Sequence, residues 1–228
     1  MCGRFKLEVP WSEVHRLYQL TLNLNLRPRY NIAPSQGVLA IRYNAETHQR
    51  IASELRWGLI PFWAKEASIG YKMINAKAEG ISEKPSFREA FKSRRCIIPA
   101  DGFYEWKATG AKMKQPYAIV MQDRSVFGFA GLWERWRDKA NGGEVVESCT
   151  IITTEPNAVC APIHNRMPVI LPPESYATWL GEREAGADEL LALLKPYPAE
   201  KMTAFPIGPR IGNVRNEGPE LLEPIQAE

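Results

Sequence analysis

Cysteine is scarce in this chain of 228 residues, which contains only four. Cys2, Cys96, Cys149 and Cys160 form no CxxC pair, the spacing typical of zinc sites, and no framework typical of disulfide-rich secreted domains. We therefore predict free thiols in a reducing, cytoplasmic compartment, with neither a metal nor another cofactor. Cys96 and Cys149 lie in apolar runs and are interpreted as core thiols.

Long hydrophobic runs are also absent. No apolar stretch approaches the roughly 18 residues of a membrane-spanning helix, and the N-terminus has no apolar region typical of a secretory signal. An excess of charge of one sign is missing as well, because 29 Lys and Arg residues against 26 Asp and Glu residues leave a net charge of +3. These features exclude a membrane partner and are compatible with a localised basic groove.

The composition is that of an ordinary globular protein, with 45% hydrophobic and 24% charged residues. The 18 prolines and 16 glycines are spread along the chain, so no linker or low-complexity segment stands out. We predict a single domain over residues 1–228, with its motifs between about residues 2 and 216 and a short polar tail. We expect a monomer.

Hydrophobic periodicity predicts several strands and few helices. Helices are expected at residues 9–20, 85–93, 175–180 and 187–195; strands are expected at residues 37–43, 50–59, 95–107, 116–123, 125–136, 145–154, 168–172 and 202–208. Because βαβ alternation is rare, the pattern favours an α+β fold with a curved, barrel-like, mostly antiparallel sheet and peripheral helices.

The opening MCGRF places a cysteine where a chain end usually frays. A terminus is a poor place to bury a small hydrophobic side chain, so we expect Cys2 to expose a reactive thiol. The small side chains of Cys2 and Gly3 favour removal of Met1, which would leave an α-amine and a thiol on one residue. Their ordinary pKa values, about 7.7–8.0 and about 8.5, make both groups tunable to neutral pH.

Three further segments carry reactive side chains in turn-like contexts. INAKAEG contains Asn75, Lys77 and Glu79; GFYEW contains Glu105; and IHNRM contains His164, one of only three histidines. A lone histidine is more often structural than catalytic, and a lone glutamate in a strand usually faces solvent. Taken singly, these residues leave both interpretations open.

The combination resembles the SRAP family, the SOS response-associated peptidases also described as abasic-site processing proteins. The motifs that carry this resemblance occur in the expected order: MCGR, RYNIAP, RWGLIPFW, INAKAEG, PSFREAFKSRRCIIPADGFYEWK, IHNRMPVIL and IGNVRN. Two positions depart from the family pattern, since Lys77 stands where arginine is usual and Asn165 where aspartate is common. Lysine keeps the charge but loses the bidentate fork of arginine, which weakens an expected phosphate contact.

The resemblance implies a protein that binds single-stranded DNA containing abasic sites and links to them covalently through Cys2. In this chemistry the amine condenses with the aldehyde of the opened sugar, and the neighbouring thiol closes a five-membered thiazolidine ring, with the entropic advantage of an intramolecular step. By the same resemblance, Asn75 holds the terminal residue or the sugar, and Glu105 shuttles protons. His164 serves as a second acid/base or holds the opened sugar and its phosphate. Lyase activity 3′ to the lesion and self-peptidase activity are implied as well.

A strand-binding surface is implied too, because single-stranded DNA needs cations for its phosphates and aromatic platforms for its bases. Packing in the core is an equally good explanation for any one of seven tryptophans. The residues assigned to DNA binding are Arg4, Lys77 and Arg166 for the backbone, Thr153 for a phosphate hydrogen bond, and Trp63, Trp106 and Pro34 for the bases.

Two other functions compete with this hypothesis. Glutamine amidotransferases also begin with Met-Cys-Gly, so an N-terminal-nucleophile amidohydrolase is an alternative in which the thiol attacks an amide. A non-catalytic single-stranded DNA-binding module would leave Cys2 without a role and bind DNA reversibly. The sequence identifies no protein partner at the replication fork.

Overall fold

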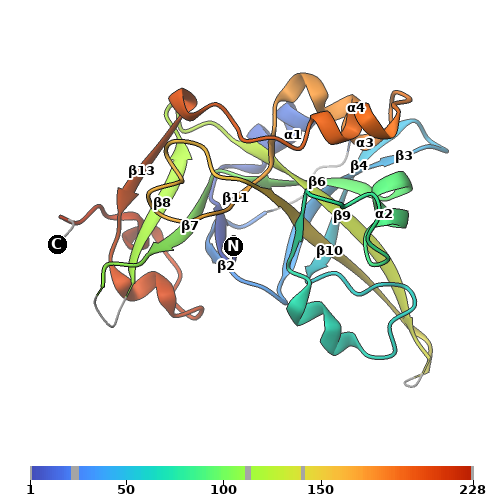
Figure 1. Ribbon diagram of the computed structural model, residues 1–228, viewed down its shortest axis with the longest axis horizontal. Helices are drawn as coiled ribbons and strands as arrows, with labels where there is room; N and C mark the ends of the chain where they lie inside the picture. The colour runs from blue at the N-terminus through green and yellow to red at the C-terminus, as the bar shows by residue number, and fades with distance from the viewer. Residues whose placement is uncertain (1, 22–25, 111–113, 140–141, 227–228) are drawn as a thin grey trace.

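The computed structural model describes residues 2–21, 26–110, 114–139 and 142–226, and it confirms the predicted α+β class (Figure 1). The strands are β1 (Phe5–Leu7), β2 (Arg29–Ile32), β3 (Gly37–Asn44), β4 (Gln49–Trp57), β5 (Asn75–Lys77), β6 (Arg95–Ala100), β7 (Gly102–Lys107), β8 (Gln115–Met121), β9 (Phe127–Asp138), β10 (Glu144–Thr154), β11 (Met167–Pro168), β12 (Ile170–Leu171) and β13 (Met202–Pro206). The α-helices are α1 (Trp11–Tyr18), α2 (Arg88–Ser93), α3 (Tyr176–Leu180) and α4 (Ala187–Ala192). Short 3₁₀ helices are η1 (Ala67–Lys72), η2 (Pro173–Ser175), η3 (Ala199–Lys201), η4 (Pro209–Gly212) and η5 (Pro219–Leu222).

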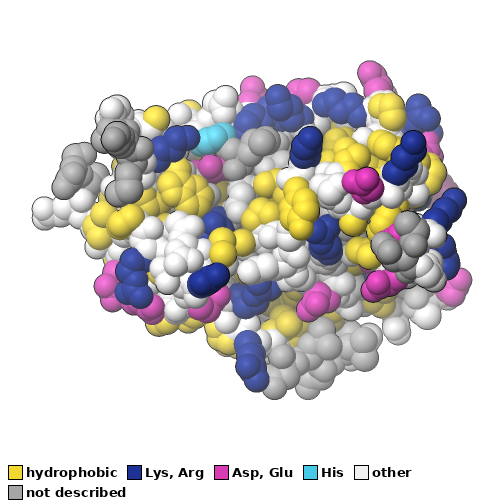
Figure 2. Space-filling view, turned by 90° about the horizontal axis from the view of Figure 1, so that it is seen from below, with side chains coloured by type: hydrophobic (Ala, Val, Ile, Leu, Met, Phe, Trp, Pro, Cys, Tyr) yellow, Lys and Arg dark blue, Asp and Glu magenta, His cyan; other side chains and the backbone are white. Residues whose placement is uncertain are grey.

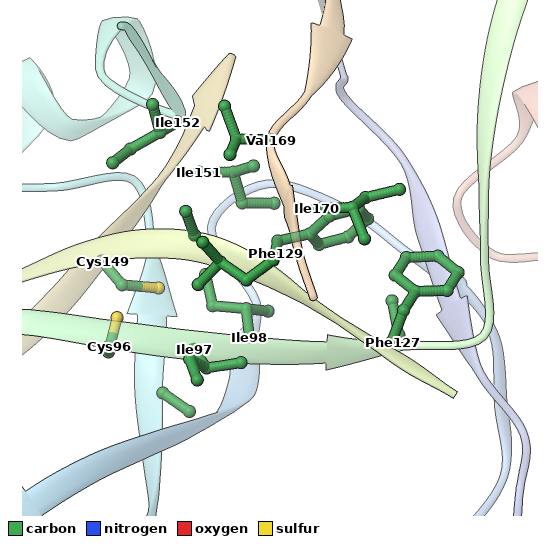
Figure 3. Close-up of a cluster of buried hydrophobic side chains, with 14 of the residues drawn as sticks. Cys96, Ile97, Ile98, Phe127, Phe129, Cys149, Ile151, Ile152, Val169 and Ile170 are labelled. Atoms are coloured by element: carbon green, nitrogen blue, oxygen red, sulfur yellow. The ribbon is translucent and has the colours of Figure 1, made fainter. Parts of the chain in front are cut away.

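Strands β4, β3, β6, β9 and β10 pair in that order and close into a barrel, because β10 also pairs with β4. The β4–β10 pairing is parallel, and the other four pairings of the ring are antiparallel. The predicted curved, mostly antiparallel sheet is therefore confirmed. Isoleucine and phenylalanine side chains fill the centre, and the Cys96 and Cys149 side chains lie among them (Figure 3).

A second sheet has the strand order β13–β8–β7–β1–β2 and is antiparallel throughout. Its fourth strand, β1, lies between β2 and β7, with Phe5 opposite both Ile32 and Phe103. The Phe5 ring contacts the barrel, since its centroid lies 5.2 Å from that of Trp57 and 5.7 Å from that of Phe129. The start of the chain is thus held between two sheets.

The helices are peripheral, as predicted, and α1, α3 and α4 gather over one side of the molecule (Figure 1). Helix α1 buries Trp11, Val14 and Tyr18, the face that its hydrophobic spacing indicates. Tyr18 stacks on Tyr176 at the start of α3, with ring centroids 5.2 Å apart. Within the described residues, no helix is long and apolar enough to cross a membrane.

Three local predictions need correction. Residues 95–107 form two strands instead of one, because the Asp101 carboxylate accepts the backbone N–H groups of Glu8 and Val9, at 2.7 and 3.0 Å, and turns the chain between the sheets. Residues 168–172 contribute to two strands of two residues each. Residues 75–77 form β5, a parallel partner of β10, where a turn was expected.

Candidate active site

Cys2 lies three residues before the first residue of strand β1 and is buried. Its side chain is fully buried, so the expectation of an exposed thiol is wrong. The reason is the sheet order, which places β1 between β7 and β2 and covers the chain end from both sides. Burial, followed by the negative charge of Glu105, raises the pKa of the Cys2 thiol well above its ordinary value.

Glu105 lies on β7, the strand next to β1, where the Tyr104 N–H donates to the Arg4 carbonyl at 3.0 Å. Its side chain is buried, which raises the pKa of the Glu105 carboxyl to about 7. A carboxyl with this pKa is present in both protonation states at neutral pH, as a general acid/base requires. The Cys2 and Glu105 side chains are therefore both buried, and the charge of Glu105 acts on the Cys2 thiol.

His164 ends a turn between β10 and β11, and its backbone N–H donates to the Cys160 carbonyl at 2.9 Å. The Arg166 backbone N–H donates to His164 Nδ1 at 3.1 Å, so in the neutral ring the proton resides on Nε2. Burial lowers the pKa of His164, which favours this neutral form at pH 7. The imidazole can therefore donate a hydrogen bond from Nε2.

Cys160 is a site residue that sequence reasoning missed. Its side chain is buried, and burial, followed by the charge of Glu105, raises the pKa of its thiol to about 12. The Asn157 carboxamide holds its turn, because Asn157 Oδ1 accepts the N–H groups of Val159 and Cys160. Cys160 thus lies in the turn that carries His164, and its thiol feels the charge of Glu105; the only sequence signal is the spacing of four residues between Cys160 and His164.

Asn75 and Lys77 lie on β5, whose register with β10 places Asn75 opposite Ile151 and Lys77 opposite Thr153. The Asn75 Oδ1 atom and the Thr153 hydroxyl are buried, and neither has a hydrogen-bond partner among the described residues. Buried polar atoms are rarely left unpaired in native proteins, so these two atoms are candidates for contact with a ligand. Lys77 is exposed.

Arg166 lies beside this strand pair and uses its guanidinium within the protein. Its two terminal nitrogens donate to the Glu79 carboxylate at 2.6 and 2.9 Å, and Nη2 also donates to the Thr153 carbonyl at 2.5 Å. The chain therefore brings together Lys77, Thr153 and Arg166, three residues assigned to the DNA backbone, together with Glu79.

Arg4 is placed differently from the other two predicted backbone contacts. It is buried, and its Nη1 donates to Asn31 Oδ1 at 2.6 Å and to the Ile211 carbonyl at 2.8 Å. Asn31 in turn donates to the carbonyls of Asn213 and Asn216, at 3.0 and 2.9 Å. Arg4 thus fastens the IGNVRN segment to β1 and β2.

The aromatic candidates have contrasting surroundings. Trp63 is 48% exposed and neighbours a cavity of about 320 Å³ whose rim includes Lys65, Arg137 and Lys139. Trp106 is half-buried in a small apolar cluster, with the Arg4 guanidinium 5.8 Å from its ring centroid. Pro34 is half-buried in the turn after β2. On the face seen in Figure 2, hydrophobic side chains lie between those of Lys and Arg.

The described residues contain no group of three or more His, Cys, Asp or Glu side chains that could hold a metal ion.

Comparison with known proteins gives consistent matches along the chain. The family described as SOS response associated peptidase (SRAP) matches residues 1–214. Abasic site processing protein YoqW of Bacillus subtilis (strain 168) is 46% identical over 226 residues, which cover 98% of this chain and 99% of that protein. Abasic site processing protein HMCES of Mus musculus is 34% identical over 231 residues, with 86% of this chain and 65% of that protein covered. A crystal structure of a Bacteroides thetaiotaomicron protein superimposes with a TM-score of 0.88 at 30% identity, covering 99% of this chain and all of that one (100%).

Proposed function

The chain belongs to the SOS response associated peptidase (SRAP) family, and from this premise we propose that it processes abasic sites in DNA by forming a covalent cross-link through Cys2. Several of its relatives carry the name abasic site processing protein. The observation that supports the mechanism is the burial of both Cys2, just before β1, and Glu105, on the neighbouring strand β7, with the charge of Glu105 acting on the Cys2 thiol.

The proposed reaction begins when Met1 is removed, by self-cleavage or by an aminopeptidase, and Cys2 gains a free α-amine. The amine nitrogen attacks the C1′ aldehyde of a ring-opened abasic sugar and gives a hemiaminal. Glu105, in its protonated form, donates a proton to the hemiaminal hydroxyl, which leaves as water and yields a protonated imine (an iminium ion). The Glu105 carboxylate is then available to accept a proton.

The second step closes the ring. A buried thiol with a raised pKa stays protonated at neutral pH, so it needs a nearby base to become a nucleophile. The Glu105 carboxylate takes the thiol proton, which restores its protonated form, and the sulfur attacks the carbon of the protonated imine, whose nitrogen keeps its own proton as the ring N–H. The product is a thiazolidine, formed with the net loss of one water and without an oxidant or reductant.

The remaining site residues are proposed to hold the substrate. His164 offers its Nε2 proton to the opened sugar or its 3′ phosphate, and the unpaired Asn75 Oδ1 accepts a sugar hydroxyl. Lys77, Thr153 and Arg166 bind phosphates, while Trp63 stacks on a base. Proton removal from C2′ of the imine by the same acid/base groups would give β-elimination, a lyase side reaction.

The test is incubation of the protein with a single-stranded oligonucleotide that contains one abasic site, followed by a denaturing gel. We expect a slower-migrating adduct that survives denaturation. Oligonucleotide whose abasic sites were reduced beforehand lacks the aldehyde and should give none. An adduct that forms equally on the reduced DNA, or no adduct on the untreated DNA, would overturn the proposal.

A further inference from the structure

Two hydrogen bonds other than those to Glu79 hold Arg166 in place. Its backbone N–H donates to His164 Nδ1 at 3.1 Å, and Nη2 donates to the Thr153 carbonyl at 2.5 Å. The Arg166 side chain is only 14% exposed. The first contact holds the Arg166 backbone against the half-buried His164 ring and the second holds the guanidinium against the Thr153 carbonyl, so neither depends on an exposed residue.

The same guanidinium also binds the Glu79 carboxylate. Both terminal nitrogens contact the carboxylate, at 2.6 and 2.9 Å, which is the paired arrangement that arginine makes with carboxylates and phosphates alike. The Glu79 side chain is 62% exposed, so it can leave this position into solvent with little loss of packing. The ion pair thus joins a fixed cation to a movable anion.

The backbone of Glu79 stays fixed when the side chain moves. Lys84 Nζ donates to the Glu79 carbonyl at 2.9 Å, and the chain turns at Gly80 with a φ of 69°. Rotation of the side chain alone is therefore enough to free Arg166. The hydrogen bonds to Arg166 are the main cause that lowers the pKa of Glu79 to about 2, and the charge of Lys77 also contributes.

The Glu79 carboxylate therefore pairs with Arg166 and feels the charge of Lys77, the two cations that the proposed function assigns to the DNA backbone. We propose that Glu79 occupies a phosphate position in the DNA-free protein and competes with the bound strand for Arg166. This inference rests on the proposed function, because it requires a nucleic-acid phosphate at Arg166. Its consequence is that Glu79 weakens binding to every single strand and limits unproductive binding to undamaged DNA.

The test measures reversible binding of a fluorescent oligonucleotide without abasic sites, by anisotropy. Glu79→Gln keeps the size of the side chain and removes its charge, whereas Glu83→Gln removes a charge from an exposed residue of the same segment and serves as the matched control. We expect Glu79→Gln to bind about 1.5- to fivefold more tightly than Glu83→Gln, the range that couplings of exposed ion pairs allow. In a background of Arg166→Gln, the gain should vanish.

Three results would overturn the inference: Glu79→Gln binding no more tightly than Glu83→Gln, a gain that persists without Arg166, or binding that becomes weaker, which would make Glu79 a support for Arg166. A second measurement follows the Glu79 carboxyl by NMR, and its pKa should rise from about 2 toward 4.5 when DNA is bound. Since no abasic site is present in either experiment, a failure here is distinct from a failure to form the covalent adduct.

Discussion

Replacing Glu105 with glutamine separates proton transfer from simple positioning, because the amide keeps the size of the carboxyl but cannot exchange a proton. The structure sets the magnitude. At pH 7 a carboxyl with a pKa of 4.5 is protonated in about 0.3% of molecules, whereas one with a pKa of about 7 is protonated in about half. Burial therefore increases the fraction of Glu105 that is protonated at pH 7 by about 150-fold.

The assay is a time course of adduct formation on abasic single-stranded DNA, run as single turnovers between about pH 5.5 and 8.5 and resolved on denaturing gels. The parent rate should change across pH 7, where Glu105 titrates. Glu105→Gln should lose that dependence and react about 10²–10⁴-fold more slowly. Reversal of the adduct should slow as well, because a catalyst acts on both directions of a step.

The matched control is Glu134→Gln, which alters another buried glutamate of a strand, one that is bound to Arg94 at 2.9 Å. It should leave the pH dependence of adduct formation unchanged, even if the fold is less stable. Parental rates for Glu105→Gln at every pH would make Glu105 a packing residue and refute the catalytic assignment.

The same pKa has a consequence for stability. Because the folded-state pKa of Glu105 is raised from 4.5 to about 7, the folded protein holds this proton more tightly than the unfolded chain. The contribution is fully present below pH 4.5 and is lost as the pH rises through 7, by at most about 3 kcal/mol. Glu105→Gln should therefore raise the melting temperature relative to the parent at pH 8 and not at pH 4.5. An equal shift at both pH values would contradict the raised pKa.

Further predictions concern the nucleophile and the DNA surface. Cys2→Ala should abolish the adduct and retain reversible DNA binding, and an uncleaved N-terminal tag should be equally damaging; full-rate cross-linking by the tagged protein would exclude the thiazolidine. Lys77→Ala should reduce the slope of log affinity against log salt by about 0.7, and an unchanged slope would place the phosphate elsewhere. Trp63→Ala should weaken binding by about 1–3 kcal/mol without a change in melting temperature, because the ring is half exposed. Trp106→Ala should lower the melting temperature, since this side chain packs in an apolar cluster. Equal melting temperatures for the two variants would contradict the difference in packing between Trp63 and Trp106.

The sequence predicts the barrel well because its strands are long and carry a local hydrophobic pattern. It does not predict β1, β2 or β5, which contain three or four residues each and exist only through their partners. Asn75 pairs with Ile151, which lies 76 residues later in the chain, and no local sequence pattern indicates such a pairing. The strands that the sequence does not predict also carry or adjoin the site residues.

The same limit applies to the site residues. The motifs identify Cys2, Glu105 and His164, but the burial of Cys2 depends on which strands flank β1, and that is a property of the whole sheet. Cys160 gives no sequence signal beyond its spacing from His164. The ion pair of Glu79 with Arg166 joins segments 87 residues apart and becomes visible only in three dimensions.

In the proposed adduct, the amine nitrogen and the sulfur of Cys2 are both bonded to C1′ of the abasic sugar. The most direct measurement is mass spectrometry of the adduct after digestion of the protein and the DNA. We expect a modified peptide that begins at Cys2, with a mass equal to the peptide plus the sugar fragment minus one water, and a thiol that no longer reacts with alkylating reagents. A sugar on a lysine, on a peptide that retains Met1, or on a Cys2 whose thiol still alkylates would contradict it.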